Sequence, residues 1–437
     1  MNNHVSTSFW DISAPISKLH EELDGVQASI AGRVVGYRRM GGVAFGQIVD
    51  QSGKIQFCFN KRDIALEYFK TWSEDIHLGD IIGIAGVMWT SSTGERTLNV
   101  TQSFKLLQRP VLSWPDKHTG IVDPEVRLRK RYLDCIVHPE VKEVFKIRHK
   151  VIQCLRDFLT YRDFTEIETP ILTPQASGAQ ARPFITHHHA LDSDFYLRIA
   201  PETYLKRAVA GGFDRVFEIG KQFRNEGIDP SHMQEFTTVE WYSAYSNYLD
   251  NLALFHDYIA RLQMVVGNRG FLQNLNIEPV KVLYRDLFHT KVGTYPDSHS
   301  ATEADRLFKT LVRPTIIAPT YVLDYPAHMS PMAARKPDDN TTAEQWQFIV
   351  NGWEVVKCYT ELTDPVLQRK LLEEQMAQRA SGDAEAMMLE EDFLECMEHG
   401  MPPMSGLGLG IDRLVCLITE QTTLRDVVLF PTLRTSK

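Results

Sequence analysis

The stretch VFEIGKQFRNEGIDPSHMQEFTTVEWY, residues 216–242, consists of two β-rich runs joined by a polar turn. Arg224 and Glu226 lie two residues apart, so their side chains share a face of an extended strand, where a guanidinium can clamp oxygens of a carboxylate and a phosphate. His232 and Phe236 follow in the same hairpin. An isolated Arg-x-Glu pair is more often a structural ion pair on a sheet surface. The imidazole of His232 and the ring of Phe236 in the same hairpin favour a binding site for ATP instead.

A glycine-rich segment, GLGLGIDR at residues 406–413, lies far downstream of this hairpin. It differs from Rossmann and P-loop signatures because it closes on Ile-Asp-Arg, lacks a lysine followed by serine or threonine, and spaces its glycines as GxGxG. We expect these glycines to let backbone approach backbone. Gly410 and Arg413 are therefore candidates for the ATP site, with Arg413 reaching a phosphate.

The composition is that of an ordinary globular protein: 437 residues, 43% hydrophobic and 24% charged, enough for two domains. No apolar run approaches the ~20 residues of a membrane span. Residues 1–10 have neither the basic end nor the apolar core of a signal peptide, so we expect a cytoplasmic protein without a membrane partner. Six cysteines without metal-ligand spacing predict reduced, mostly buried thiols. The net charge of −9 argues against indiscriminate nucleic-acid binding but allows a local basic face.

Residues 25–108 alternate β-rich runs with glycine- and serine-containing turns, which is typical of a small antiparallel barrel. The β-rich runs are 26–35, 43–49, 55–59, 81–87 and 98–100. A helix-like piece at 63–72 interrupts them, and five strands with one such interruption are what an OB-fold shows. An unrelated small β-barrel is the alternative. Residues 1–24 are expected to form an N-terminal extension.

Two prolines and a tryptophan mark a linker at residues 109–118, and residues 119–437 form the expected second domain. A long helical pattern at 144–161 is followed by short apolar runs mixed with helices, without the regular period of a parallel sheet. We therefore expect an α+β domain with a mostly antiparallel sheet flanked by helices. The expected strands are 195–199, 216–223, 236–242, 355–359 and 427–430. The expected later helices are 202–209, 251–266, 366–379 and 392–399, and the polar segments 338–342 and 381–384 are expected to be surface connections.

These segments resemble the three motifs of class II aminoacyl-tRNA synthetases. FRNEG at 223–227 with HMQEF at 232–236 resembles motif 2, GLGLGIDR resembles motif 3, and residues 164–170 resemble motif 1. Further matches resemble the lysyl-tRNA synthetase family: RYLD at 131–134, ARPFITHHHALD at 181–192, YLRIAPETYLKR at 196–207, YTELTDP at 359–365 and RDVVLFPTLR at 425–434. The resemblance covers the chain from residue 26 and implies an anticodon-binding OB-fold barrel followed by a class II catalytic domain, in a homodimer built partly on motif 1.

For ATP, the resemblance implies one role for each residue of this binding site. Arg224 would contact the substrate carboxylate and the α-phosphate, and Arg413 the γ-phosphate. Glu226 and Phe236 would hold adenine, and His232 would lie by the phosphates. ATP is then a substrate, and Mg²⁺ the expected metal.

For lysine, the resemblance implies that the carbonyl of Gly178 and the side chain of Glu202 take the α-amino group, while Tyr242 and Glu361 take the ε-ammonium. Such a buried ammonium needs a carboxylate and further acceptors. Without them, its removal from water would cost on the order of several kcal/mol. Lys357, Tyr359 and Glu361 alternate along the chain, so a regular strand points all three into one pocket. For Glu361 taken alone, a surface salt bridge is the alternative.

Three positions depart from the family pattern as the resemblance gives it. Lys357 stands where an asparagine usually holds the lysine carboxylate, Gln347 stands where a first metal-binding glutamate is usual, and Ser231 replaces a phosphate-binding arginine. The second metal-binding glutamate is retained as Glu354. One hypothesis is that Lys357 partly replaces one Mg²⁺, so that fewer ions bind than is usual. Its rival is that metal binding persists through Glu354 and phosphate oxygens, since Mg²⁺ often needs only one or two protein carboxylates.

In the barrel, Phe45 and Gln56 lie on either side of a turn at Ser52 and Gly53. Paired strands allow them to face outward together, with the ring stacking on a base and the amide reading its edge. A core phenylalanine and a surface glutamine are the alternative. The resemblance implies that this pair binds the central uridine of the anticodon, and Arg38 and Arg39 would contact phosphates.

The resemblance implies an enzyme that joins lysine to the 3′ end of tRNA(Lys) through an adenylate. Two alternatives stay open: a related enzyme that lysylates a protein, and a catalytically silent tRNA-binding protein. The first typically lacks an anticodon domain, and the second is expected to lose Arg224, Glu226 or Arg413.

Overall fold

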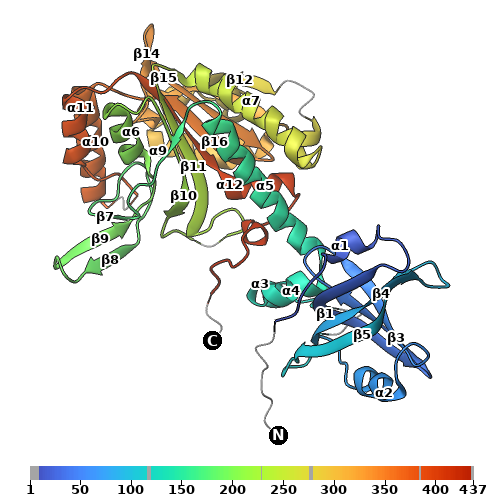
Figure 1. Ribbon diagram of the computed structural model, residues 1–437. Coiled ribbons are helices and arrows are strands. Elements are labelled where there is room, and N and C mark those ends of the chain that lie inside the picture. Colours follow the sequence, from blue (N-terminus) through green and yellow to red (C-terminus); the bar gives the residue numbers. More distant parts are fainter. Residues whose placement is uncertain (1–8, 116–119, 228, 275–278, 383–384, 435–437) are drawn as a thin grey trace. The chain divides into compact units, whose positions relative to one another are not determined.

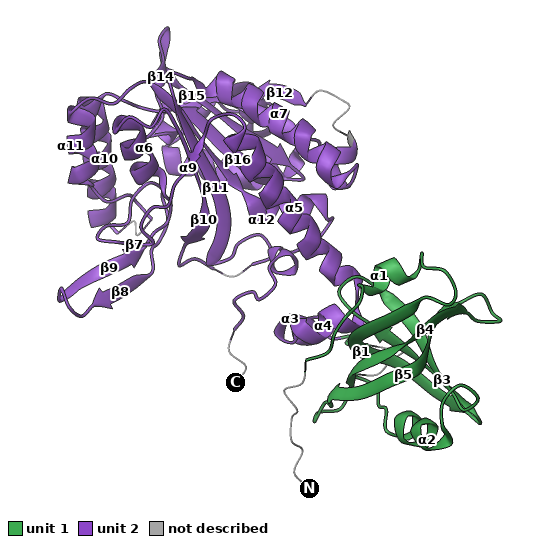
Figure 2. Cartoon of the chain, in the orientation of Figure 1, with its two compact units in different colours: residues 1–122 green, residues 123–437 purple. Residues whose placement is uncertain are grey.

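The computed structural model describes residues 9–115, 120–227, 229–274, 279–382 and 385–434. The chain divides into two compact units, Met1–Val122 and Asp123–Lys437, coloured separately in Figure 2. Each unit has its own hydrophobic core and is described by itself.

The first unit is a closed five-stranded barrel in which the strand order is β1-β2-β3-β5-β4. Its elements are α1 (Ile16–Leu19), β1 (Gln27–Met40), β2 (Val43–Val49), β3 (Lys54–Asn60), α2 (Leu66–Glu74), β4 (Ile81–Thr90) and β5 (Arg96–Gln108). Alternate side chains of β2 and β3, such as Ile48 and Phe57, are buried in the barrel core. The expected barrel and its single helical interruption are confirmed.

Part of the expected N-terminal extension belongs to this barrel. Ile16 and Leu19, the two ends of α1, are 0% and 2% exposed and join the barrel core. Trp10 lies against Gly83, where a Cβ would come within 2.2 Å of the indole Cδ2 atom. Residues 10–19 therefore pack against the barrel through Trp10, Ile16 and Leu19.

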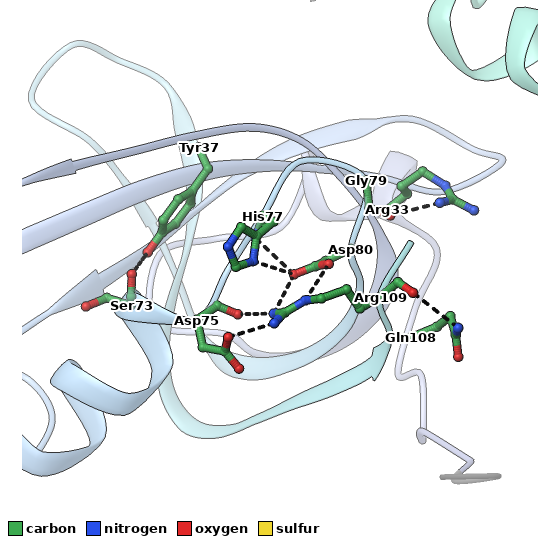
Figure 3. Close-up of polar contacts among 9 residues, drawn as sticks. All are labelled: Arg33, Tyr37, Ser73, Asp75, His77, Gly79, Asp80, Gln108 and Arg109. Atoms are coloured by element: carbon green, nitrogen blue, oxygen red, sulfur yellow. Dashed lines mark hydrogen bonds and ion pairs between the residues drawn. The ribbon is translucent and has the colours of Figure 1, made fainter. Parts of the chain in front are cut away.

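A buried ionic cluster fixes the point at which the chain leaves the barrel (Figure 3). The fully buried carboxylate of Asp80 accepts hydrogen bonds from the Arg109 guanidinium, at 3.0 and 3.2 Å, and from the backbone N–H of His77 at 2.9 Å. Arg109 also donates to Asp75 at 2.7 Å. Arg109 is the first residue of the expected linker, so this segment begins tied to the barrel.

The second unit is built on a nine-stranded sheet that is antiparallel except for the β12/β13 and β10/β6 pairs (Figure 1). The strand order is β12-β13-β15-β16-β17-β11-β10-β6, with β14 paired to β15. The strands are β6 (Thr165–Glu166), β10 (Arg215–Phe223), β11 (Glu235–Ala244), β12 (Val280–Leu283), β13 (Thr320–Pro326), β14 (Arg335–Lys336), β15 (Asp339–Val350), β16 (Trp353–Thr360) and β17 (Met404–Gly410). A separate three-stranded sheet has the order β7-β9-β8, with β7 (Leu172–Thr173), β8 (Ile185–His188) and β9 (Ser193–Leu197).

Helices cover both faces of the large sheet. The helices α5 (Glu140–Thr160), α7 (Tyr248–Val266) and α12 (Ile411–Ile418) form one core with Val239 and Trp241 of β11. The helices α6 (Glu202–Ala210), α10 (Pro365–Ala380) and α11 (Glu391–Glu398) form another with Tyr242. Because Trp241 and Tyr242 are consecutive in a strand, these cores lie on opposite faces. The shorter helices are α3 (Pro124–Arg129), α4 (Arg131–Val137), α8 (Tyr284–Val292) and α9 (Ala301–Leu307).

One sequence expectation for this unit is wrong, and a second, the surface connection at 338–342, holds only in part. Residues 427–430 form no strand: the 3-10 helix η6 spans Leu424–Val427, and Val427 is buried in the core without a strand partner. A four-residue apolar run cannot distinguish a strand from another buried segment. Residues 338–342 are the tip of the β14–β15 hairpin, and β15 already begins at Asp339. The Asp339 carboxylate satisfies the nearby hydroxyls of Thr341 and Thr342, which lets a polar sequence enter a strand.

Candidate active site

The β10–β11 hairpin brings Arg224 and Phe236 together. The strands are in register from Arg215 opposite Ser243 to Phe223 opposite Glu235, and just beyond them the backbone N–H of Arg224 donates to the carbonyl of Gln234 at 2.8 Å. The Arg224 guanidinium carbon lies 5.1 Å from the centroid of the Phe236 ring, within the range of a cation–π contact. An adenine or a phosphate at this point would therefore meet a flat ring and a cation side by side.

The turn of this hairpin holds two more of the expected ATP residues, Glu226 and His232. The carbonyl of Glu226 accepts the side-chain amide of Gln234 at 3.1 Å, which fixes the backbone beside Arg224. Nδ1 of His232 lies 2.8 Å from the carboxylate of Asp229, and the Ser231 hydroxyl donates to the same carboxylate. Residue 228 lies outside the described residues. The imidazole of His232 is thus oriented by an acidic partner that the sequence analysis did not single out.

Arg413 projects from the start of α12, directly after the glycine-rich strand β17. Its Nη1 donates to the backbone carbonyl of Glu354 at 2.8 Å. Burial lowers the pKa of Arg413, an effect opposed by Glu354 and increased by the charges of Arg313 and Arg224. Arg313 and Arg224 therefore both lie within electrostatic reach of Arg413, an arrangement suited to a polyanion.

The capacity of this region for a metal ion rests on Glu354. Within the described ranges, no group of three or more histidine, cysteine, aspartate or glutamate side chains is placed to hold a metal ion. Gln347, buried on β15, offers an amide at the position that the resemblance gives to a first metal-binding glutamate. One carboxylate fits a single Mg²⁺ ion whose remaining ligands come from phosphate and water.

The expected lysine pocket is a buried ionic network. The hydroxyl of Tyr359 donates to both carboxylate oxygens of Glu202, at 2.7 and 2.8 Å. Lys206 is fully buried: its Nζ donates to Glu202 at 2.6 Å and forms an ion pair with Glu361. Burial raises the pKa of Glu361, an effect that the Lys206 ammonium opposes. The protein's own ammonium thus bridges two carboxylates that were expected to bind substrate.

Glu240 completes this pocket and was missed in the sequence analysis. The Tyr242 hydroxyl donates to its carboxylate at 3.1 Å. Burial, with a smaller contribution from the charge of Glu202, raises the pKa of Glu240 to about 8. A signal for this residue was present, because Phe236, Glu240 and Tyr242 are separated by even numbers of residues and so share one face of β11.

Two glycines make room for the pocket. At Gly406 a Cβ would lie 2.2 Å from the Tyr242 ring and 2.3 Å from a Glu361 oxygen. Gly178 has φ +82°, and a Cβ there would lie 3.1 Å from that of Glu202. At Gly410 the nearest atom to a Cβ is 3.8 Å away, an ordinary contact. The expectation that the glycines admit neighbouring backbone is therefore wrong for Gly406, which admits pocket side chains instead.

Lys357 lies on β16 between Gln347 of β15 and Gly408 of β17. Its side chain is exposed, and its Nζ lies 5.6 Å from the centroid of the Tyr359 ring. Within the described part of the chain no carboxylate forms an ion pair with it. Lys357 and Tyr359 thus share a face, as alternation predicts, and Glu361 follows in a β-bridge with Ala333.

Buried ion pairs support both sides of the site. Arg198 donates to Glu218 at 2.6 Å and to the carbonyl of Lys221 at 3.0 Å, and so fixes strand β10. Gly220 is needed there, since a Cβ would lie 2.3 Å from the Arg198 guanidinium. These contacts hold β10 in the position from which Arg224 projects.

On the barrel, the expected tRNA-binding residues gather at β1, β2 and β3. Phe45 lies opposite Cys58 and Gln56 opposite Gln47, so Phe45 and Gln56 share the outward face. Gln56 is nevertheless buried, and its amide donates to Thr97 at 2.8 Å. The Arg38 guanidinium carbon lies 5.7 Å from the Phe45 ring, whereas Arg39 pairs with Glu74 at 3.0 Å. Phe45 and Arg38 are the more available of the four.

Two further features of the chain concern its cysteines and its helices. None of the six cysteines forms a disulfide, and four of them are buried. Among the helices of the described residues, none combines the length and apolar character that crossing a bilayer needs. The candidate site consists of a group of arginines and an acidic pocket on the second unit.

Comparison with known proteins gives the same architecture. Residues 123–434 match the family model described as tRNA synthetases class II (D, K and N), and residues 28–106 match an OB-fold nucleic acid binding domain. A lysine–tRNA ligase of Aquifex aeolicus (strain VF5) is 41% identical, over 94% of this chain and 73% of the relative. Lysine–tRNA ligases of Clostridium tetani (strain Massachusetts / E88) and Thermoanaerobacter sp. (strain X514) are 39% and 40% identical, over 97% of this chain and 90% of each relative. The chain therefore belongs to the class II tRNA synthetase family, among the lysine–tRNA ligases.

Proposed function

We propose that the protein is a lysine–tRNA ligase, which activates L-lysine with ATP to lysyl-adenylate and pyrophosphate and then transfers the lysyl group to the 3′ end of tRNA(Lys). The observation that carries this proposal is the buried acidic pocket of Glu202, Glu240 and Glu361. Such a pocket suits a substrate with two ammonium groups. It lies beside Arg224 on the same strand pair, where an activated carboxylate would be stabilised.

The first step needs charge stabilisation and positioning more than proton transfer. The lysine carboxylate is already ionised at neutral pH, so one of its oxygens attacks the α-phosphorus of ATP directly, and the bond to the bridging oxygen of pyrophosphate breaks. Arg224 contacts the attacking carboxylate and the α-phosphate, and Arg413 contacts the leaving pyrophosphate end. Glu226 and Phe236 hold adenine, while His232 lies by the phosphates.

In the second step the 3′-terminal hydroxyl of tRNA attacks the lysyl carbonyl carbon, and the bond to the adenylate phosphate breaks. AMP leaves, and the hydroxyl proton is lost. Fixed donors around the adenylate stabilise the developing charge without reorganisation, which is commonly the largest contribution to such catalysis.

Lysine is recognised at both of its ends. The Gly178 carbonyl and Glu202 accept the α-ammonium, while Tyr242, Glu361 and the newly identified Glu240 surround the ε-ammonium. Glu202 and Glu361 already share the ammonium of Lys206, so a neutral side chain of similar length would leave three acidic groups with only one ammonium among them, which is unfavourable. The ring of Tyr359 closes the pocket through its hydrogen bonds to Glu202.

Mg²⁺ would be held by Glu354 together with phosphate oxygens, and when bound it supplies countercharge to the polyphosphate. Lys357 has no carboxylate partner within the described residues, so we assign it to the carboxylate of substrate lysine. Replacing Lys357 by asparagine should increase the Mg²⁺ concentration needed for half-maximal pyrophosphate exchange. An unchanged Mg²⁺ dependence would remove this role.

We also propose that the barrel binds the anticodon of tRNA(Lys) through Phe45, Gln56, Arg38 and Arg39, and that the enzyme is a cytoplasmic homodimer. Phe45 would stack on a base and Arg38, which is exposed beside the Phe45 ring, would contact a phosphate. Gln56 must exchange its hydrogen bond with Thr97 for one with a base. The unpaired cysteines are compatible with a reducing compartment.

Lysine-dependent exchange of pyrophosphate into ATP, followed by charging of tRNA(Lys), tests this proposal. Exchange and charging together support the ligase. Exchange with lysine transfer to a protein, and not to tRNA, would identify a protein-lysylating enzyme instead. Binding of tRNA without any exchange would identify a silent tRNA-binding protein.

A further inference from the structure

Arg313 lies in a segment between the two glycine- and arginine-containing motifs, and the sequence assigns it no role. It begins the 3-10 helix η4 (Arg313–Thr315), which follows the π-helix η3 (Phe308–Val312). Its side chain is partly buried and forms no ion pair with any carboxylate of the described residues. A cation that is partly removed from water without a partner requires an explanation.

The backbone fixes η4 against the turn between β15 and β16. The N–H of Gly352 donates to the carbonyl of Ile316 at 2.8 Å, and that of Asn351 to the carbonyl of Ile317 at 3.0 Å. A Cβ at Gly352 would lie 3.2 Å from the Cα of Pro314. This turn leads directly into Glu354, whose carbonyl accepts the guanidinium of Arg413. Arg313 is therefore anchored next to the Glu354–Arg413 contact.

The pKa shifts of two other residues, Arg413 and Tyr325, support this position of Arg313 near Glu354. The charge of Arg313 adds to the burial that lowers the pKa of Arg413, and Glu354 opposes it. Burial raises the pKa of Tyr325 on β13, Glu354 raises it further, and Arg313 lowers it. The charges of Arg313 and Glu354 thus both act on Arg413 and on Tyr325. These four side chains therefore belong to one region.

Several donors in this region have no hydrogen-bond partner in the described part of the chain. They are Nε of Arg313, Nε of Arg224 and the hydroxyl of Tyr325, all buried. Arg224 and Arg413 also form no ion pair with a carboxylate of the described residues. Buried donors are almost always satisfied in folded proteins, so the unsatisfied Nε atoms of two of these three arginines, with an unsatisfied tyrosine hydroxyl, indicate a site for an anion rich in oxygen acceptors.

We propose that Arg313 is a third arginine of the polyphosphate site, acting with Arg224 and Arg413 to bind the β- and γ-phosphates of ATP or the pyrophosphate product. This inference rests on the proposed function only for the identity of the anion as ATP. Arg313 is anchored in the same region as Glu354, on which the capacity of the described residues for Mg²⁺ rests. It supplies protein-borne positive charge that a second ion would otherwise provide, so a single Mg²⁺ suffices.

Inorganic tripolyphosphate provides a probe that requires neither lysine nor catalysis. Its binding to the full chain is measured by calorimetry, first with a chelator and then across a Mg²⁺ titration. Arg313→Met is compared with the wild type and with Arg306→Met, a control on α9 whose arginine is exposed and paired with Glu303. Because a bidentate charged contact is lost, Arg313→Met should weaken metal-free binding by about tenfold or more, and Arg306→Met should not.

The Mg²⁺ titration tests the second part of the proposal. The wild type should take up one Mg²⁺ per tripolyphosphate at the site, whereas Arg313→Met should need more Mg²⁺ to recover its affinity. Arg313→Lys keeps the charge and should recover part of it, which excludes general misfolding. Metal-free binding by Arg313→Met within twofold of the wild type would overturn the proposal. Because lysine is absent, failure of lysine-dependent exchange would count against the proposed function alone.

Discussion

The carboxylate of Asp412 accepts the backbone N–H of Thr237 at 2.7 Å, and so ties the end of the glycine-rich segment to strand β11. Its other oxygen accepts Arg148 of α5 at 2.5 Å, and Arg148 also donates to the Thr237 hydroxyl. Asp412 precedes Arg413, and Thr237 follows Phe236. One buried carboxylate therefore ties the neighbour of Arg413 to the neighbour of Phe236, the two residues that we propose for the terminal phosphate and the base.

Replacing Asp412 by asparagine should reduce both stability and catalysis. The change leaves the partly buried Arg148 without its counter-charge, so we expect a loss of about 3–5 kcal/mol in the free energy of unfolding of the second unit. Thermal unfolding and kcat/KM for pyrophosphate exchange measure the two effects. The control is Glu166→Gln, which removes the exposed pair with Arg156 and should cost less than about 1 kcal/mol. Equal effects of the two changes would contradict this account.

Gly406 and Gly408 form a matched pair on one strand. Alanine at position 406 would place its Cβ 2.2 Å from the Tyr242 ring, whereas at position 408 the nearest atom, on Glu240, is 3.7 Å away. Gly406→Ala should therefore displace Tyr242 and Glu361 and raise the KM for lysine by about a hundredfold, while a Gly408→Ala change should stay within about threefold. If both variants bind lysine normally, the pocket is not where we place it.

Glu240 should make the protein respond to pH near neutrality. Its pKa is raised from 4.5 to about 8, so its protonated form stabilises the folded chain fully below pH 4.5, and this contribution is lost as the pH rises to about 8. Glu240→Gln mimics the neutral acid and should gain thermal stability relative to the wild type across that interval. Parallel melting temperatures from pH 5 to about 8.5 would rule out the shift.

The same ionisation should couple to lysine binding. An incoming ammonium favours the ionised carboxylate, so binding by the wild type at pH 7 should release a proton from Glu240. Calorimetry in buffers of different ionisation enthalpy measures this release. It should disappear in Glu240→Gln, and its persistence there would assign the proton to another group.

Phe45→Ala should separate tRNA recognition from amino-acid activation. Stacking of one base on an aromatic ring contributes about 1–3 kcal/mol, so the KM for tRNA(Lys) should rise by roughly tenfold to a hundredfold. Pyrophosphate exchange without tRNA should be unaffected. Tyr68→Ala serves as the control, because Tyr68 is an exposed aromatic on α2 of the same unit. A loss of exchange activity in Phe45→Ala would indicate a structural role instead.

Local patterns in the sequence predicted much of the fold. The barrel strands follow from alternation between turn residues, and the β10–β11 hairpin follows from two β-rich runs around FRNEG. Residues 427–430 show the limit of this reasoning. An apolar run can be buried in the core with or without a neighbouring strand to pair with. Whether such a strand is present depends on the tertiary structure, which the run itself does not encode.

The site was less predictable where charged residues are buried, because their spacing in the sequence usually indicates an exposed position. Glu202 and Lys206 are four residues apart on a helix, a spacing that normally indicates a solvated pair, yet both are buried. Arg313 has no local pattern at all, because its importance comes from a β-turn that lies nearly forty residues downstream, at Asn351 and Gly352. Glu240 was within reach, since it alternates with two residues that the pattern already indicated.

The packing of residues 10–19 against the barrel determines where the chain can be cut to isolate the first unit or to transfer it to another protein. A fragment or chimera cut at residue 25, where the β-rich sequence starts, would lose Ile16 and Leu19 from the interior and Trp10 from its place over Gly83. The severed barrel would expose apolar surface and tend to aggregate. A transplantable anticodon module must therefore begin before Trp10.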